Sequence, residues 1–368
     1  MQCHFSVNGP KSRDGNGVET RLKVWFKAGL EGSPWAVLLV LFASGLPAFG
    51  VSCMTQSQMA GAQRTVLEQS AQMLGANVQS GNAAAVRAET ISAVAAQFDG
   101  IAGSIQSVDT SIQHATLTVD GIYLLDASDL KAAEETQFFC GVAGSPLTVE
   151  ITIPALPPGK YALAILHATG VKQPQQISLI LQNDPAGSPI WKLAGFFTRP
   201  MTMGGHDGIW FWRQAREYAA KKKLWDAWFY YQTAQYLLNP VDFLSSPNLQ
   251  KLQREAEQTR PDNLPGADPL HISAGAQTFD ITSLHTGELS DQLDLVITYD
   301  ATPNQDLVAA RAQVTAVMRA LLQQHPELQS AFHGLWVYAV TPGNPRPFAL
   351  ELPMEQIENS PPSAGQRS

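Results

Sequence analysis

The chain has 368 residues, of which 45% are hydrophobic and 15% charged, and its 24 Lys and Arg against 32 Asp and Glu give a formal charge of −8. This length leaves room for more than one domain with a full core, and a mean hydropathy of −0.08 excludes a protein built mainly of membrane spans. The acidic balance, with no long basic run, excludes a nucleic-acid binder, because binding to phosphates needs clustered Lys and Arg.

Residues 1–52 predict an export signal or a membrane anchor. Basic residues outnumber acidic ones before residue 34, and the apolar run Trp35–Ala48 follows. This pattern is typical of a secretory signal. The run is short for a membrane span, which needs about 20 residues, so a cleaved signal is favoured over an uncleaved N-terminal helix. In both cases we expect the rest of the chain to be exported, either free in the periplasm or held at the membrane through its N-terminus.

The segment Gly50-Val-Ser-Cys53 resembles a bacterial lipobox, whose cysteine is lipidated after cleavage, although Gly50 stands where Leu is usual. Cys53 is therefore the candidate for lipidation, and cleavage after the small residues of Ala48-Phe-Gly50 is the alternative. We expect Cys140, which follows two phenylalanines, to be an isolated, buried small hydrophobe. The sequence thus predicts no disulfide framework and no metal site.

Residues 56–200 predict helices followed by antiparallel strands. Up to residue 112, apolar residues recur at helical spacing in Ala- and Gln-rich segments, with Asn82 as a candidate N-cap. The period then changes to two, as in Leu147–Ile153, where apolar and polar residues alternate. Strands are predicted at 115–126, 136–141, 147–154, 160–168, 175–183 and 189–198.

This order of elements, with Ser80–Ala88 leading into a helix and Trp191–Phe197 as the closing strand, resembles the nuclear transport factor 2-like (SnoaL-like) superfamily over about residues 57–200. The resemblance implies an α+β domain with a curved, cone-like antiparallel sheet. In different members the mouth of the cone binds a small ligand, holds an isomerase or hydratase site, or serves only in pairing, so the fold implies no single function. The alternative is a β-sandwich behind a helical hairpin, because the turn Pro157–Tyr161 is also typical of immunoglobulin-like modules.

Three side chains are candidates for the mouth of such a cone: His167, Tyr123 and Asp126. Tyr and Asp are the residue types that an isomerase uses for oxyanion donation and proton abstraction. Their placement rests on strand alternation alone, so the sequence favours structural roles for them.

Residues 204–258 predict a helical unit rich in aromatic side chains. Small and large residues alternate there, including Ala227 and Tyr231, which resembles a single tetratricopeptide repeat at about 207–240. One repeat cannot bury its own face. We therefore expect the surplus aromatic residues to face another domain, a partner such as another envelope protein, or the rest of this chain. The candidate binding residues are Trp210, Trp212, Trp225, Trp228 and Tyr231.

The glycine-rich segment Gly204–Gly208 contains His206 and Asp207. In one interpretation they are a base with its orienting acid, or two ligands of a metal. In the other, Asp207 caps the helix that begins at Gly208. The second is favoured, because a metal site needs three or four ligands and no further residue stands at ligand spacing. No metal and no cofactor is assigned.

Residues 259–270 hold three prolines and a glycine and are interpreted as a linker. Residues 271–356 predict a small α+β domain in the order strand, strand, helix, strand, strand (ββαββ), with the helix at about 304–323. Residues 357–368 form a polar tail that we expect to be disordered.

The chain has no Gly-x-Ser-x-Gly elbow, no Gly-Lys-Ser/Thr phosphate loop, no Gly-x-Gly-x-x-Gly and no Cys-x-x-Cys, which counts against hydrolases, nucleotide enzymes and thiol-redox enzymes. The sequence favours an exported bacterial envelope protein that acts as a non-catalytic binding or scaffold module. The alternative is a small-ligand binder, or an enzyme of the isomerase or hydratase type, that uses the pocket of the cone. Enzymatic activity and oligomeric state are left open.

Overall fold

The computed structural model describes residues 50–141, 144–145, 147–183, 190–301, 306–343 and 346–359. The apolar run of the predicted leader and most of the predicted tail lie outside these residues. In the described part, no helix combines the length and apolar character that crossing a membrane requires. That part is a mixed α/β structure with several antiparallel sheets, none of which closes into a barrel.

Helices precede most strands of the first large sheet, as the sequence predicts, but a short strand that was not predicted, β1 (Ser52–Thr55), comes before them. The helices are α1 (Gly61–Gln79), α2 (Ala83–Ala88), α3 (Ser92–Ala95) and α4 (Asp99–Ile112), after a short 3-10 turn, η1 (Gln56–Gln58). Asn82 is the N-cap of α2, because its Oδ1 accepts a hydrogen bond from the N–H of Ala85 at 3.1 Å. Fully buried residues such as Leu67 and Leu74 recur along α1 and form the stripe that faces the sheet.

The strands expected in one curved sheet belong to two sheets. The larger is antiparallel, in the order β1-β2-β5-β6-β7, and consists of β1 (Ser52–Thr55), β2 (Thr116–Asp126), β5 (Lys160–Thr169), β6 (Gln175–Asn183) and β7 (Trp191–Pro200). The smaller has the order β10-β4-β3 and consists of β3 (Glu134–Gly141), β4 (Thr148–Leu156) and β10 (Leu244–Ser245). The hairpin β3–β4 thus leaves the larger sheet and pairs with β10, a short strand inside the helical unit, between residues 238 and 247.

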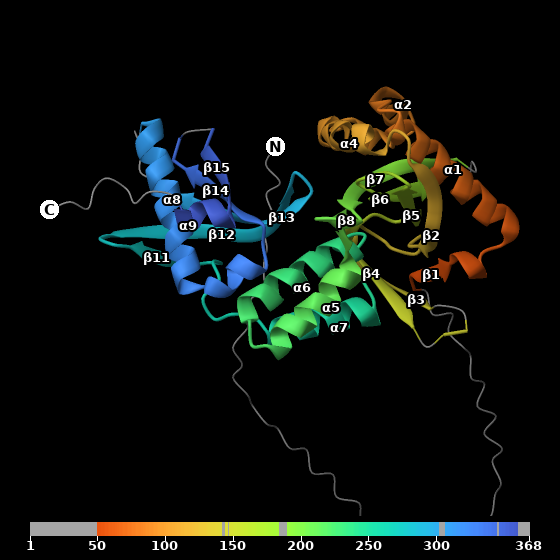
Figure 1. Ribbon diagram of the computed structural model, residues 1–368. Helices are drawn as coiled ribbons and strands as arrows, with labels where there is room; N and C mark the ends of the chain where they lie inside the picture. Colours follow the sequence, from red (N-terminus) through yellow and green to blue (C-terminus); the bar gives the residue numbers. More distant parts are fainter. Residues whose placement is uncertain are drawn as a thin grey trace, which may run out of the picture. The chain divides into compact units, whose positions relative to one another are not determined.

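Strand β5 shows why two layers form. Its residues Ala162, Ala164 and Leu166 belong to the core beneath the helices, whereas Tyr161 and Leu163 belong to the core shared with β3, β4 and β10. A strand covered on both faces is continuously apolar rather than alternating. Helices α1, α2 and α4 lie over one face of the larger sheet (Figure 1), and the smaller sheet covers part of the other.

The predicted helical unit consists of α5 (Gly208–Ala220), α6 (Leu224–Leu238) and α7 (Pro247–Gln258), which lie side by side (Figure 1). A two-stranded ladder, β8 (Thr202–Met203) with β9 (His206–Asp207), leads into α5. The start of α5 approaches the end of α6 so closely that a Cβ on Gly208 would lie 2.5 Å from Cγ of Leu238. Ala227 and Ala234 are fully buried, and small residues at these positions let the helices approach one another.

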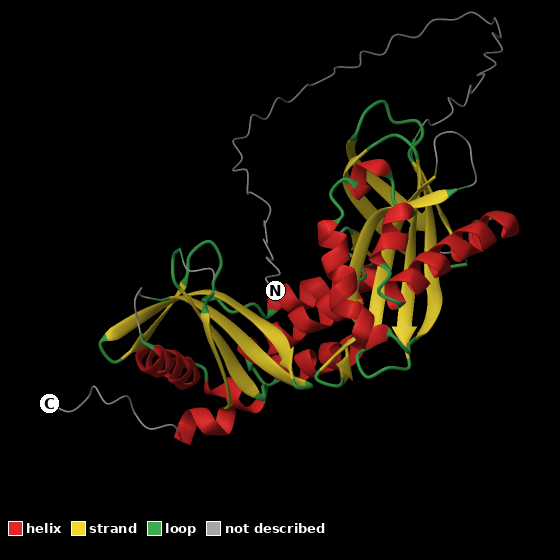
Figure 2. Ribbon diagram, turned by 90° about the horizontal axis from the view of Figure 1, so that it is seen from above, coloured by secondary structure: helices red, strands yellow, loops and turns green. Residues whose placement is uncertain are grey.

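The C-terminal sheet has the order β11-β12-β13-β14-β15. Its strands are β11 (Leu270–Ala274), β12 (Gln277–Leu289), β13 (Gln292–Asp300), β14 (Gly334–Val340) and β15 (Phe348–Pro353). Helix α8 (Leu307–Gln324), followed by the 3-10 helix η2 (Pro326–Ser330), connects β13 to β14, which pair in parallel, and α9 (Met354–Asn359) follows β15. Helix α8 lies across one face of this sheet (Figure 2).

The C-terminal domain has one strand more than the predicted ββαββ order. The predicted helix and four strands are present, and β11 precedes them as a fifth strand paired with β12. The sequence interpretation missed it because β11 is short and directly follows Pro269 in the segment interpreted as a linker.

Candidate functional site

The aromatic residues of the helical unit lie against the C-terminal part of this chain. One buried cluster contains Phe211 and Phe229 from the helical unit together with Ile281 and Phe332 from beyond residue 270. The hydroxyl of Tyr230 donates a hydrogen bond to the carbonyl of Ala331 at 2.6 Å. Of the alternatives that the sequence left open for these aromatic residues, the structure therefore shows packing within the same chain.

The individual aromatic candidates differ in exposure. Trp225 and Tyr231 are buried, whereas Trp210, Trp212 and Trp228 are half-buried at the margin of the cluster. Trp225 also lies against the ring of His325, with 3.8 Å between ring centroids.

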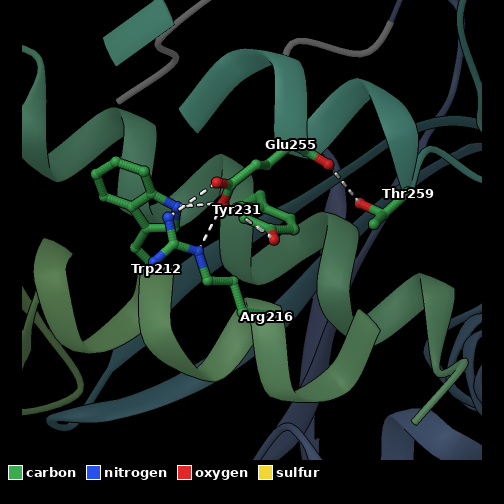
Figure 3. A network of polar contacts seen from close by, with 5 residues as sticks. All are labelled: Trp212, Arg216, Tyr231, Glu255 and Thr259. Atoms are coloured by element: carbon green, nitrogen blue, oxygen red, sulfur yellow. Dashed lines mark hydrogen bonds and ion pairs between the residues drawn. The ribbon is translucent and has the colours of Figure 1, made fainter. Parts of the chain in front are cut away.

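Glu255 of α7 connects all three helices of the unit (Figure 3). Its Oε2 accepts hydrogen bonds from Nε1 of Trp212 and Nε of Arg216, both at 2.7 Å, and the Tyr231 hydroxyl donates to the same oxygen at 3.5 Å. Thr259 donates to the main-chain carbonyl of Glu255 at 3.4 Å. The guanidinium of Arg216 also lies 4.6 Å from the centre of the Trp212 ring. Trp212 and Tyr231, two of the candidate binding residues, are thus bonded within this network.

The network changes the acidity of its members. Burial raises the pKa of Glu255, but the hydrogen bonds from Arg216 and Trp212 outweigh it, so this pKa lies below its usual value. Burial and the neighbouring Glu255 raise the pKa of Tyr231 to about 12. The carboxylate is therefore ionised and the phenol neutral at physiological pH, which keeps these hydrogen bonds in place.

Asp207 is the N-cap of α5, as the favoured interpretation predicted. Its Oδ1 accepts a hydrogen bond from the N–H of Trp210 at 2.7 Å. The ring of His206 stacks on that of Trp210, with 3.6 Å between centroids and 5° between planes. Both His206 and Asp207 are exposed, and neither lines the pocket beside Tyr123.

The structure does not bring together the three candidates for the mouth of a cone. His167 of β5 lies 3.6 Å from Asp120, whereas Asp126 lies 3.6 Å from Lys160. The register of β2 with β5 pairs Thr118 with His167 and Asp126 with Lys160, so His167 and Asp126 are at opposite ends of this ladder.

Tyr123 lies in an open pocket of about 410 Å³ between β1, α1 and β2. Its lining residues are Thr55, Gln56, Ser57, Arg64, Gly121, Ile122 and Tyr123. Burial, and then Asp120, raise the pKa of Tyr123 above its usual value, so the phenol is a neutral hydrogen-bond donor. The pocket offers a phenol and a guanidinium, and neither His167 nor Asp126 lines it.

Cys53 and Cys140 form a disulfide, with a sequence separation of 87. The expectation that Cys140 is isolated, and that the chain has no disulfide, is therefore wrong. The sequence could not show this pairing, because the two residues belong to different sheets and meet only where the edge strand β1 passes beside β3. Lipid attachment needs the thiol of Cys53, so lipidation and this disulfide exclude one another.

Asp226 on α6 is a completely buried carboxylate that the sequence analysis did not select. In the structure, neither of its oxygens has a hydrogen-bond partner, and the nearest cation, Nζ of Lys223, is 3.9 Å away. Burial raises the pKa of Asp226 to about 7, against the smaller opposing effect of Lys223.

Three further residues that the sequence analysis passed over meet on the C-terminal sheet: Asp294, His333 and Glu351. Each offers an atom able to bind a metal, and these atoms lie within 4.8 Å of one another. Within the described residues, this is the group that could hold a metal ion. One signal was present in the sequence, because Asp294 places a carboxylate inside the apolar strand segment Leu293–Tyr299.

Comparisons of the chain with protein-family models, with curated proteins and with solved structures return no match. The resemblances to the nuclear transport factor 2-like superfamily and to a tetratricopeptide repeat therefore remain predictions from sequence pattern. The roles of the candidate residues are inferred from their geometry.

Proposed function

We propose that this chain is an exported bacterial envelope protein whose described part is a binding or scaffold module. The observation that carries the proposal is the disulfide between Cys53 and Cys140. Disulfides persist in the periplasm and outside the cell and are rare in the cytosol. Cys53 follows directly on the predicted leader, and the apolar run Trp35–Ala48 supplies the export signal.

The proposal includes a cone-like first domain and a tetratricopeptide-like pair, α5 and α6. Helices over one face of an antiparallel sheet support the first, and buried small residues between α5 and α6 support the second. The helical unit shares a buried cluster with the C-terminal sheet, so it serves as a connector within the chain. A binding surface for an envelope partner would then involve one of the partly exposed tryptophans at the margin of this cluster, Trp210, Trp212 or Trp228.

A non-catalytic role agrees with the contacts of the candidate residues. Asp207 accepts the capping hydrogen bond, His206 stacks on an indole, and Asp126 faces a lysine. The second candidate function is binding of a small ligand, and the pocket at Tyr123 favours it. That pocket lacks a carboxylate or imidazole that would act as a base, so it supports binding more than catalysis.

Expression from the native start codon in a bacterial host, followed by fractionation and intact-mass measurement with and without reductant, tests the proposal. We expect an envelope-associated or secreted chain that lacks two hydrogens relative to its dithiol form, because Cys53 and Cys140 are joined. A Cys140→Ser variant is the matched control and should expose one thiol to alkylation. A cytosolic chain with both thiols free, or a lipid on Cys53, would contradict the disulfide on which the proposal rests.

A further inference from the structure

Asp294, His333 and Glu351 come together at one end of three neighbouring strands of the C-terminal sheet, β13, β14 and β15. Asp294 lies on β13, His333 directly precedes β14, and Glu351 lies on β15. The register pairs Asp294 with Gly334 and Glu351 with Trp336. Since β14 lies between the other two strands, its first residues stand between the two carboxylates.

The backbone holds His333 firmly at this place. Its N–H donates to the carbonyl of Leu293 at 2.8 Å, and its own carbonyl accepts from the N–H of Met354 at 2.9 Å. The backbone of His333 is thus bonded to β13 on one side and to the first residue of α9 on the other. Its Nδ1 lies 3.1 Å from Oδ1 of Asp294, while the side chain keeps 40% of its surface exposed. The cluster is therefore open to solvent on the side of His333.

Each of the two carboxylates has one oxygen without a hydrogen-bond partner. Asp294 is completely buried, and its Oδ2 has no hydrogen-bond partner in the structure. Oε1 of Glu351 is buried without a partner as well. An unsatisfied buried carboxylate oxygen is costly, and two such groups facing one another are costlier still. A cation between them removes both costs.

Gly334 keeps the space between these carboxylates open. A Cβ at this position would lie 2.9 Å from Oε1 of Glu351 and 3.2 Å from Oδ1 of Asp294. It would also lie 2.7 Å from the carbonyl of Leu352. Any side chain here would enter the space that the two carboxylates face.

We infer that Asp294, His333 and Glu351 bind one divalent transition-metal ion, with Zn²⁺ as its representative and solvent completing the coordination. An imidazole with two carboxylates is a ligand set that suits zinc and its neighbours. Mg²⁺ and Ca²⁺ take oxygen ligands almost alone, so the histidine argues against them. Three protein ligands leave at least one position for water or a further ligand, as in open zinc sites. This inference is independent of the proposed function.

A proton shared by the two carboxylates is the competing explanation. Burial raises the pKa of Asp294, and burial together with Asp294 raises that of Glu351. In that case the unsatisfied oxygens would be relieved without any metal, and His333 would contribute nothing to metal affinity. Binding measurements on variants distinguish the two explanations.

The test is calorimetric titration of the purified, chelator-treated chain with ZnCl₂, repeated with MgCl₂ and CaCl₂. We expect one Zn²⁺ per chain and much weaker binding of the other two ions. His333→Gln and Asp294→Asn should each lower the Zn²⁺ affinity by at least about tenfold, because the loss of a mere outer-shell partner of a ligand already costs about that much. Titration with Co²⁺ supplies a spectroscopic readout, because protein-bound cobalt shows visible absorption that added Zn²⁺ should abolish.

His271→Gln is the matched control. His271 lies in the same sheet, with Nδ1 2.7 Å from Oδ1 of Asp280, but on an exposed surface without a third ligand. Its replacement should leave Zn²⁺ binding unchanged. Because His333 is partly exposed, His333→Gln should fold, which thermal melting confirms even if Asp294→Asn does not. Failure of the wild-type chain to bind Zn²⁺, or equal affinities in the wild type and His333→Gln, would overturn the inference.

Discussion

The ammonium of Lys223 lies 3.9 Å from the carboxylate of Asp226, which is completely buried in the first turn of α6. This distance is too long for a hydrogen bond, so the lysine compensates only part of the cost of burying the acid. The result is a carboxyl group whose pKa is raised to about 7, between the helical unit and the η2 turn that carries Glu327.

The contribution of Asp226 to stability should therefore fall with rising pH. The pKa of Asp226 lies above its usual value of 3.8 in the folded chain. Between about pH 4 and pH 7, Asp226 holds a proton in the folded chain that it has released in the unfolded chain, so its contribution to the free energy of unfolding decreases across this window and levels off above it. The decrease is on the order of 1.4 kcal/mol per unit of pKa difference.

Asp226→Asn should remove this contribution and make the chain more stable than the wild type at neutral pH, but not below about pH 4. Denaturant unfolding of both chains across this range measures the difference, and other titrating groups cancel in the comparison. Asp262→Asn, at an exposed position, is the control and should change nothing. A parallel pH dependence of Asp226→Asn and wild type would show that the carboxylate is not perturbed.

Loss of the disulfide should destabilise the chain. The bridge between Cys53 and Cys140 closes a loop with a sequence separation of 87, and a cross-link over such a loop contributes about 2–5 kcal/mol, largely by restricting the unfolded chain. Cys140→Ser should lower the unfolding free energy by this amount. Cys53→Ser should have the same effect, and the double variant no more, because one bond is lost in each. Additive effects would mean that the cysteines act separately.

The contribution of the N-cap at the start of α5 to stability can be measured separately from any role of Asp207 in ligand binding. Asp207→Ala should cost about 0.5–2 kcal/mol in thermal or denaturant unfolding, because the N–H of Trp210 loses its acceptor. Asp207→Asn retains an acceptor oxygen and should cost much less. If both variants lost a binding activity while keeping their stability, Asp207 would belong to a ligand site instead.

Glu255 and Glu257 lie on the same helix, so the stability cost of replacing a glutamate inside the network can be compared with that of replacing an exposed one. Glu255 binds Trp212 and Arg216, whereas Glu257 makes an exposed ion pair with Arg260 at 3.6 Å. Glu255→Ala should destabilise the chain by about 1–3 kcal/mol, and Glu257→Ala by less than about 1 kcal/mol. A double-mutant cycle of Glu255→Ala with Trp212→Phe should show coupling. Equal costs at the two positions would argue against the network as a link between the helices.

Periodicity was enough to predict most helices and strands, because it reports which face of an element is buried. The alternation in Leu147–Ile153 corresponds to β4, and the predicted C-terminal helix corresponds to α8. Periodicity did not reveal which strands share a sheet. The continuous apolar run of β5 was the available signal, since it indicates a strand with both faces covered.

The candidate sites were harder to predict, because they depend on register. Asp294, His333 and Glu351 are distant in sequence, and only the pairing of β13, β14 and β15 brings them together. Asp207 could be predicted as a cap because capping is local. Cys140 could not be paired with Cys53 from the sequence, since neither spacing nor periodicity encodes contact between an edge strand and a separate hairpin.

The position of the disulfide also determines how the chain responds to a pull on its N-terminus. Tension applied at residue 50 and at the C-terminus passes from Cys53 through the sulfur atoms to Cys140, so the segment between them carries no load. Helices α1 to α4 and strand β2 are thereby shielded, and stretching the oxidised chain would release roughly 300 Å less length than stretching the reduced chain. In the reduced chain these elements would carry the load directly, whereas strands β5, β6 and β7 follow Cys140 and carry it in both forms.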